Sequence, residues 1–330
     1  MTRNSPVSPT VNFEKDGKQH GFLRLPYSRD ESALGAVLIP VCVIKNGSGP
    51  TVVMTGGNHG DEYEGPVCLL KAAKEIELSQ VKGRVIIMPC LNFPAVQGGS
   101  RTSPIDKGNL NRTFPGRPDG TVTEKIADYM QRYVLPMADY VLDFHSGGRT
   151  LDFIPAAACH RLPDKSQEEK CIAAMKAFGA PYNLVIKEID PVGLLDTAAE
   201  ELGKIFVSTE IGGGGTLTAA SLKIAERGVH NFLVHAGVLE GEIVAADAQF
   251  LDMPDNDCYI FAERRGLIEP CVDLGQVVKM GQLVVRIHDF ERTDNVAAEY
   301  RALRDGMLTG RHFPGRVQPG DCLAIIANVG

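Results

Sequence analysis

Histidine and acidic residues follow short apolar runs at two glycine-containing positions of the chain. The stretch MTGGNHGDEYEGP carries His59 and Glu62 directly after the apolar run Thr51-Val52-Val53, and the stretch LDFHSGG carries His145. The H-x-x-E spacing of the first pair is a weak signal by itself, because patterns this short also arise by chance. A polar turn before a helix is the alternative interpretation of the same residues.

A second H-x-x-E pattern, from His288 to Glu291, shows how easily this spacing occurs. His288 follows the run QLVVRI, and neither another histidine nor a glycine junction lies nearby. We therefore interpret His288 as an ordinary surface residue and give weight to the first pattern only.

The first pattern becomes a metal site if the strands before it are neighbours. The carboxyl ends of parallel strands point the same way, so His59, Glu62 and His145 can meet at one edge of a sheet. Two imidazoles and one carboxylate with an open fourth position are the ligand set of a catalytic zinc ion. Asp143 precedes His145 by two positions, where it either orients the ring or simply ends a strand. These residues predict one Zn²⁺ per subunit.

Other side chains could act beside such an ion, which lowers the pKa of bound water and polarises a carbonyl group. Glu210, in VSTEIGGGG, lies at a third strand end, where it could take a proton from water and pass it to a leaving amine. Arg101, Asn111 and Arg112 lie in the loop GGSRTSPIDKGNLNRTFPG, and guanidinium groups bind carboxylates and oxyanions. A capping carboxylate and a solvated basic loop are the alternatives.

The elements that must position these residues change in kind along the chain. Residues 1–49 contain β-prone runs, residues 50–245 alternate short strands with helices, and residues 246–330 alternate short strands with Gly and Pro turns. We predict an α/β fold with a mixed, mainly parallel sheet covered by helices on both faces. An N-terminal β-rich segment joins this catalytic domain, and a small all-β, barrel-like domain follows it. Thr123 and Ser166 are the expected N-caps of two helices.

Composition narrows the class of protein. Hydrophobic residues make up 44% of the 330 residues and charged residues 23%, as in ordinary globular proteins. The net charge of −7 and the lack of a Lys/Arg run argue against nucleic-acid binding, and no apolar run is long enough for a membrane span. Eight scattered cysteines without a C-x-x-C pair predict reduced thiols and a cytoplasmic protein.

Four motifs in order, GGNHGDE, NLNRTFPG, LDFHSGG and STEIGGG, resemble the succinylglutamate desuccinylase/aspartoacylase family, which is related to the zinc carboxypeptidases. The resemblance covers roughly residues 50 to 240. It implies that His59, Glu62 and His145 bind zinc and that Glu210 is the general base. It also implies that Asn111 and Arg112 hold the α-carboxylate of a substrate and that Arg101 faces the scissile carbonyl.

Within the family, GFLRLPYSRD, HGDEYEGPV, TSPIDKGNLNRTFPGRPDG and DFHSGG look like the bacterial Nα-acetyl-L-2,4-diaminobutyrate deacetylases of ectoine breakdown. This likeness implies a zinc-dependent amidohydrolase that releases acetate from a small amino-acid substrate. Such a substrate carries a side-chain ammonium, for which the sequence leaves five acidic candidates open: Asp106, Asp152, Glu188, Asp190 and Asp196.

Three other hypotheses remain beside this one. The substrate could be another N-acyl amino acid, of the N-acetylaspartate or N-succinylglutamate type, or a peptide, as in true carboxypeptidases. The chain could also be a non-catalytic metal-binding module. The C-terminal segment resembles the β-barrel of biotinyl and lipoyl domains, but Arg286-Ile287-His288-Asp289 stands where those domains present an acceptor lysine. We expect it to rim the active site or to pack between the subunits of a homo-oligomer.

Overall fold

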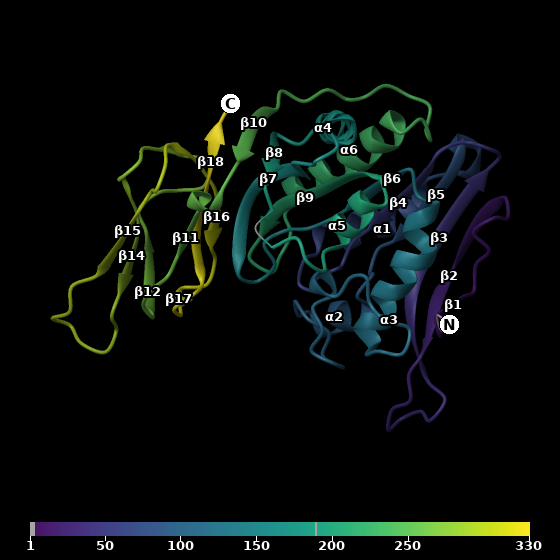
Figure 1. The fold of residues 1–330 in the computed structure, drawn as a ribbon, viewed down its shortest axis with the longest axis horizontal. Helices are drawn as coiled ribbons and strands as arrows, with labels where there is room; N and C mark the ends of the chain where they lie inside the picture. Colours follow the sequence, from purple (N-terminus) through teal and green to yellow (C-terminus); the bar gives the residue numbers. More distant parts are fainter. Residues whose placement is uncertain (1–3, 189) are drawn as a thin grey trace.

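One large mixed sheet organises the protein, as Figure 1 shows for the computed structural model, which describes residues 4–188 and 190–330. Its centre consists of four parallel strands in the order β5 (Gly83–Met88), β4 (Thr51–Thr55), β6 (Tyr140–Asp143) and β9 (Ile205–Gly213). All five residues of β4 are buried, as expected for a strand covered on both faces.

Strands of both orientations extend this parallel centre. On one side, β3 (Ala36–Asn46) pairs antiparallel with β5 and carries β2 (Gly17–Pro26) and β1 (Ser8–Pro9), so the N-terminal β-rich segment is joined to the catalytic sheet. On the other side, β7 (Leu151–His160) is antiparallel to β9 and parallel to β8 (Tyr182–Ile186). The sheet is therefore mixed, and its parallel part is the region that carries the sequence motifs.

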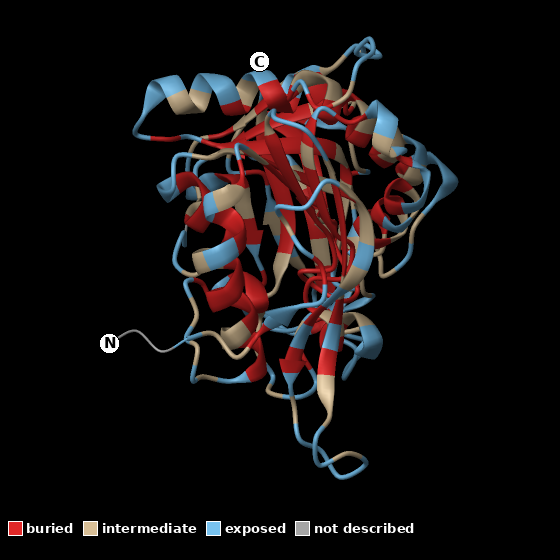
Figure 2. Ribbon diagram, turned by 90° about the vertical axis from the view of Figure 1, so that its right-hand side faces the viewer, coloured by how far each residue is buried: buried red, intermediate tan, exposed pale blue. Residues whose placement is uncertain are grey.

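Helices cover both faces of this sheet. Helices α1 (Glu64–Glu75), α4 (Lys165–Phe178) and α6 (Ala219–His235) bury apolar side chains against one face. Helices α3 (Val122–Tyr129) and α5 (Leu195–Glu201) do so against the other, and α2 (Phe93–Gly98) follows β5. Figure 2 shows the buried strands enclosed between these layers. Burial of apolar surface at roughly 25 cal/mol per Å² is what stabilises such a layered arrangement.

Two helices begin earlier than the sequence predicted. Thr121, not Thr123, caps α3, where its side chain and that of Glu124 form a capping box. Asp164, not Ser166, caps α4 and accepts hydrogen bonds from the backbone N–H groups of Ser166 and Gln167. In both helices the two candidate caps lie two positions apart in a polar stretch, so local sequence does not decide between them.

The C-terminal segment is only partly a separate unit. Four of its strands continue the main sheet beyond β8 in the order β10 (Gln249–Met253), β18 (Cys322–Val329), β16 (Gly306–His312) and β13 (Val277–Val278). The first of them, β10, pairs parallel with β8. A fifth strand, β11 (Tyr259–Phe261), pairs with β18. A second sheet contains β15 (Ala298–Arg301), β14 (Leu283–His288), β12 (Gly266–Pro270) and β17 (Arg316–Val317).

A closed ring of strands crosses the expected boundary at residue 246. Because β16 also pairs with β7, the strands β7, β8, β10, β18 and β16 form a five-stranded barrel. Two of these strands belong to the segment predicted to be the catalytic domain. The barrel-like character of the C-terminal segment thus depends on strands that precede it, and the division at residue 246 stays a prediction.

Cysteine placement agrees with the sequence. All eight thiols are free, and six of them are buried. None of the helices in residues 4–188 and 190–330 combines the length and apolar character that crossing a bilayer requires.

Candidate active site

The register of three neighbouring strands brings the predicted site residues to one edge of the sheet. Thr55, the last residue of β4, lies opposite Asp143, the last residue of β6, and Asp143 lies opposite Ser208 of β9. The residues that follow β4 and β6 therefore leave the sheet at the same level. Glu210 lies two positions beyond Ser208, on the same face of β9.

Glycines allow the chain after β4 to turn closely against its surroundings. A Cβ atom on Gly60 would lie 2.0 Å from the backbone carbonyl group of Ala95, so only glycine fits there. This close approach places His59 and Glu62 before α1, where both side chains are almost completely buried. The turn before the helix holds His59 and Glu62 in position. The metal-ligand pair and the polar turn before a helix, given as alternatives for this stretch, therefore describe one structure.

His59, Glu62 and His145 converge on a common point. His59 Nδ1 lies 2.8 Å from Glu62 Oε1, and His145 Nδ1 lies 3.0 Å from Glu62 Oε2. One ligand atom from each of the three residues lies within 4.8 Å of the other two. Two imidazole nitrogens and a carboxylate at this separation fit the donor set of a single metal ion.

Asp143 orients the His145 ring. Its Oδ2 atom lies 2.8 Å from His145 Nε2, and it also accepts hydrogen bonds from Thr55 Oγ1 and Asn58 Nδ2. A carboxylate with these contacts keeps the proton of His145 on Nε2 and leaves Nδ1 free to bind a metal. Of the two interpretations of Asp143, the geometry favours the orienting role.

Asn109 performs the same task for His59, and the sequence analysis missed it. Its Oδ1 atom lies 3.2 Å from His59 Nε2 and also accepts the backbone N–H of Asn111 at 3.1 Å. The amide oxygen accepts a hydrogen bond from Nε2, which places the His59 proton on that atom. Nδ1 is then unprotonated, faces Glu62 and can bind a metal ion. The only sequence signal is the position of Asn109 beside the NR motif, and a lone asparagine in a polar loop carries no pattern.

Replacing Asn109 with alanine is expected to weaken metal binding about 10- to 100-fold, because His59 loses the partner that fixes its tautomer and orientation. Competition for zinc with a chromogenic chelator measures this directly. Asn295→Ala, which changes an exposed asparagine of the C-terminal segment, is the matched control. Equal metal affinity in the two variants would contradict the orienting role.

Burial and charge favour a cation at this point. Burial lowers the pKa of His59, so its imidazole is neutral, as a metal ligand must be. Burial also lowers the pKa of His145, but the Asp143 and Glu62 carboxylates outweigh it and raise the pKa well above its ordinary value. Burial raises the pKa of Glu62, yet the two imidazoles prevail and hold it far below the usual range. Glu62 is therefore ionised at neutral pH.

Glu210 is a second carboxyl beside this group, in a different environment. Burial and the nearby negative charge of Glu62 raise the pKa of Glu210 to about 8, although His145 and Arg101 act in the opposite direction. Its Oε2 atom is buried and has no hydrogen-bond partner among the residues that the structure describes. Two adjacent carboxyl groups with such different pKa values are typical of sites that transfer protons.

The loop that carries Arg101, Asn111 and Arg112 lies over the same edge. Arg101 Nη1 is 3.4 Å from Glu62 Oε1, which brings its guanidinium to the three converging residues. Buried Asn111 accepts the backbone N–H of Leu195 with Oδ1 at 2.8 Å, which leaves its Nδ2 group as a donor. Exposed Arg112 donates from Nη1 to the Asn111 carbonyl at 2.6 Å. The seven predicted site residues thus lie after β4 and β6, on β9, and in the loop beside these strand ends.

A buried histidine surrounded by acids lies on the face of the sheet that carries Glu210, nearer the start of β9 because β7 is antiparallel to that strand, and was not found in the sequence analysis. His160, at the end of β7, contacts Glu200 through Nδ1 at 3.1 Å, and its Nε2 atom lies 3.8 Å from both Glu188 and Asp196. Burial lowers the pKa of His160, but these three carboxylates outweigh it and raise the pKa to about 9. His160 is therefore protonated at neutral pH.

This histidine makes folding depend on pH. A pKa of about 9 in the folded chain, against 6.5 for the free group, contributes stability that is fully present below pH 6.5 and lost as the pH rises through 9. His160→Gln should lose up to about 3 kcal/mol relative to the parent at pH 6 and progressively less toward pH 9. Chemical denaturation across this range measures the difference, with exposed His288→Gln as control. Parallel stability curves for parent and His160→Gln would contradict the argument.

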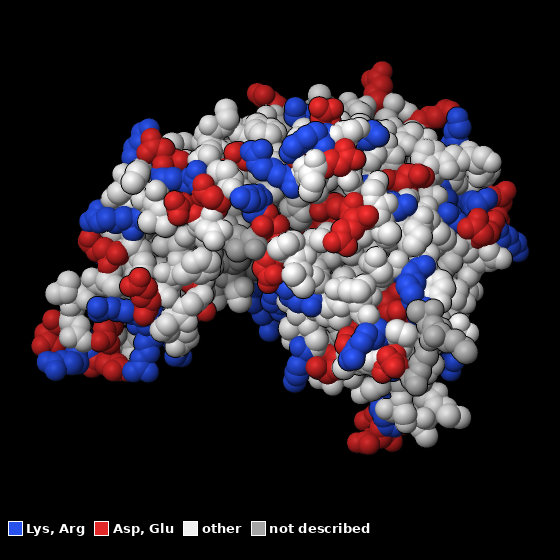
Figure 3. Space-filling model, viewed as in Figure 1, with Lys and Arg blue, Asp and Glu red and all other residues white. Residues whose placement is uncertain are grey.

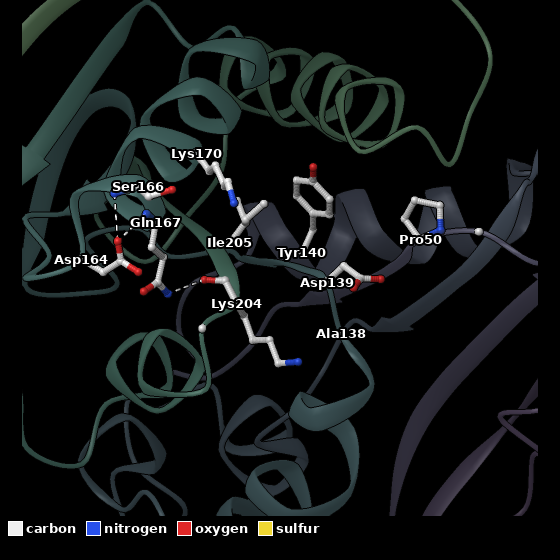
Figure 4. Close-up of a pocket in the computed structure, with 12 residues that line it drawn as sticks. Pro50, Ala138, Asp139, Tyr140, Asp164, Ser166, Gln167, Lys170, Lys204 and Ile205 are labelled. Atoms are coloured by element: carbon white, nitrogen blue, oxygen red, sulfur yellow. Dashed lines mark hydrogen bonds between the residues drawn. The ribbon is translucent and has the colours of Figure 1, made fainter.

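A cavity at the other edge of the sheet is not the catalytic site. It measures about 630 Å³ and is lined by residues near the starts of β4, β6 and β9, such as Pro50, Asp139 and Lys204, and by Lys170 of α4 (Figure 4). None of the seven predicted site residues lines it. Ligands of open α/β sheets bind at the carboxyl ends of the strands, which is the opposite edge.

The second H-x-x-E pattern has no comparable surroundings. His288 is half exposed on β14, and its Nε2 atom lies beside the exposed carboxylate of Glu269. Its interpretation as a surface residue is confirmed. Figure 3 shows Lys and Arg interspersed with Asp and Glu on the face in view, without a continuous basic patch.

Known proteins share both the sequence and the shape of this chain. The family model of the succinylglutamate desuccinylase/aspartoacylase catalytic domain matches residues 48–236. The N-alpha-acetyl-L-2,4-diaminobutyric acid deacetylase of Halomonas elongata is 56% identical, over 99% of this chain and 96% of its own length. The product-bound ectoine utilization protein EutE (DoeB) from Ruegeria pomeroyi is 56% identical, covers 99% of both chains and superposes with a TM-score of 0.97. A protein from Silicibacter sp. TM1040 described as a succinylglutamate desuccinylase is 55% identical over 100% of both chains, with a TM-score of 0.96.

Proposed function

Because the chain belongs to the succinylglutamate desuccinylase/aspartoacylase family, we propose that it removes the acetyl group from Nα-acetyl-L-2,4-diaminobutyrate in ectoine degradation. It is a hydrolytic deacylase of N-acyl amino acids, as the deacetylase from Halomonas elongata is by its name. The observation that carries the proposal is the convergence of His59, Glu62 and His145 beside the buried Glu210 carboxyl.

Zinc is the metal that this donor set fits best. His59 and His145 would bind it through Nδ1, because Asn109 and Asp143 occupy their Nε2 atoms, and Glu62 would supply an oxygen. Bound there, zinc would supply Lewis-acid polarisation of the acetyl carbonyl and a lowered pKa for water. Among the described residues, Glu210 forms no hydrogen bond with either imidazole or with Glu62, so it is available for proton transfer.

The remaining residues divide the hydrolysis among them. In its ionised form, Glu210 takes a proton from the attacking water as the new C–O bond forms, and the Arg101 guanidinium stabilises the negative charge that develops on the carbonyl oxygen. Glu210 then gives the proton to the amide nitrogen as the C–N bond breaks, which releases acetate and the free amine. Asn111 and Arg112 hold the α-carboxylate and fix the scissile amide against Glu210.

A panel of acyl amino acids tests the proposal and its alternatives. Amine release is measured after chelation and after zinc is restored, with Nα-acetyl- and Nγ-acetyl-L-2,4-diaminobutyrate, N-acetylaspartate, N-succinylglutamate and one dipeptide. Zinc-restored turnover confined to the Nα-acetyl derivative is the expected result. Preference for succinylglutamate, the substrate in the name of the Silicibacter relative, would keep the mechanism and discard the substrate. Turnover of the dipeptide would favour a carboxypeptidase, and inactivity of the zinc-loaded protein would favour a binding module.

Two further properties belong to the same proposal. The free, mostly buried thiols support a cytoplasmic location. A homo-oligomer stays a prediction, which light scattering of the purified protein would test.

A further inference from the structure

The proposed substrate differs from other acyl amino acids in its side chain, which ends in an ammonium group. A buried ammonium requires an acidic partner that is not already neutralised. Two of the five acids that the sequence left open are committed elsewhere. Asp106 accepts hydrogen bonds from Thr123 and Gly108, and Asp152 pairs with Arg311. Asp190 is exposed on its loop.

Glu188 and Asp196 remain, and both face the Nε2 atom of His160. With Glu200 on the other ring nitrogen, three carboxylates surround one imidazole, so negative charge is in excess even when His160 is protonated. Within residues 4–188 and 190–330, no lysine or arginine forms an ion pair with any of the three. Glu200 is nine-tenths buried, and its Oε1 atom has no hydrogen-bond partner there. Apart from the imidazolium of His160, the cluster therefore lacks a cation among the residues that the structure describes.

The position of Asp196 connects this cluster with the catalytic residues. Asn111, which is proposed to hold the substrate α-carboxylate, accepts the N–H of Leu195, the residue directly before Asp196. Burial raises the pKa of Asp196, while the charges of His160 and His145 act in the opposite direction. A cavity of about 480 Å³ borders the cluster at His160, Glu188 and Glu200, so packing does not seal these two carboxylates, although Asp196 itself does not line the cavity.

We infer that the side-chain ammonium of the substrate binds to Asp196, with Glu188 as a second carboxylate and His160 as the group that holds the two in place. This inference rests on the proposed function, because it assigns the specificity of the same site. An α-amino acid anchored by its carboxylate at Asn111 extends a two-carbon side chain over only a few ångströms, which matches the closeness of the start of α5. A ligand without the ammonium would leave the excess negative charge of the cluster uncompensated and would bind less well.

Substrate pairs that differ only in this charge test the inference. Nα-acetyl-L-norvaline has a methyl group where Nα-acetyl-L-2,4-diaminobutyrate has the ammonium. Asp196→Asn keeps the oxygen that accepts the Thr197 N–H and removes the charge. It should lower kcat/KM for the diaminobutyrate substrate about 10²-fold or more and leave the norvaline derivative little changed. Asp190→Asn, which removes the same charge from an exposed position, is the matched control and should alter neither value.

The outcomes separate the inference from the function beneath it. Equal losses on both substrates, or no loss on either, would overturn the role of Asp196. If Asp196→Asn does not fold, Glu188→Gln provides the second test, since Glu188 is partly exposed and a smaller loss confined to the charged substrate is expected. Failure of the parent enzyme to hydrolyse Nα-acetyl-L-2,4-diaminobutyrate would instead overturn the proposed function, whatever Asp196 does.

Discussion

Replacement of Glu210 by glutamine is expected to lower kcat at least 10²-fold, which corresponds to about 2.7 kcal/mol of activation free energy. Glutamine has nearly the same shape but cannot accept a proton from water or return it to the departing amine. The Oε2 atom is buried and has no hydrogen-bond partner among the described residues, so no hydrogen-bonded neighbour takes over the transfer. Steady-state kinetics with the acetylated substrate measure the loss.

Metal content decides what a loss of activity in Glu210→Gln means. Zinc should remain stoichiometric in this variant, because the converging atoms belong to His59, Glu62 and His145. The exposed substitution Glu201→Gln, on α5, is the control for a mere change of charge. Full activity of Glu210→Gln would remove the proposed general base, and loss of zinc from it would make Glu210 a ligand instead.

Replacement of His145 by alanine should abolish both zinc binding and activity. His145 supplies one of two imidazoles, and the remaining His59 and Glu62 leave too few protein ligands for a catalytic zinc site. Metal analysis of the purified protein gives the zinc content, and added zinc should restore a chelated parent but not this variant. His288→Ala, on the exposed surface of β14, should retain both properties.

The expected results differ between His145 and Asp143, the carboxylate that orients its ring. Asp143→Asn should weaken zinc binding about 10- to 100-fold and not abolish it, because Asp143 acts on the metal only through the His145 ring. Stoichiometric zinc in His145→Ala would contradict the ligand set. Equal losses in His145→Ala and Asp143→Asn would contradict the division between ligand and orienting residue.

The strand-end motifs could be predicted from the sequence because each consists of residues that are close together in the chain. A short apolar strand, two glycines and a polar ligand occupy a few consecutive residues in GGNHGDE and in LDFHSGG. The parallel arrangement of such strands then predicts that His59, Glu62 and His145 meet. The roles of Arg101, Asn111 and Arg112, by contrast, came from the family resemblance, and no spacing in the loop required them.

Other features depend on which distant segments become neighbours. The partner of His59 is Asn109, 50 positions away. His160 contacts three acids from a loop and a helix that follow it, namely Glu188, Asp196 and Glu200. Neither group forms a pattern in the sequence, because each member is an ordinary polar residue in its own segment. The helix caps were misplaced for a smaller reason, since several capping residues compete within one short stretch.

The sequence by itself determined the order of the catalytic motifs and the layered α/β class, since apolar periodicity and glycine junctions are local properties, and the resemblance of those motifs to known proteins indicated the family. Only the tertiary structure decided that the barrel takes β7 and β8 from the segment before residue 246. It likewise decided which of five acids meet at His160. Strand pairing between distant segments and the burial of charge both arise from packing, and packing is a property of the whole chain.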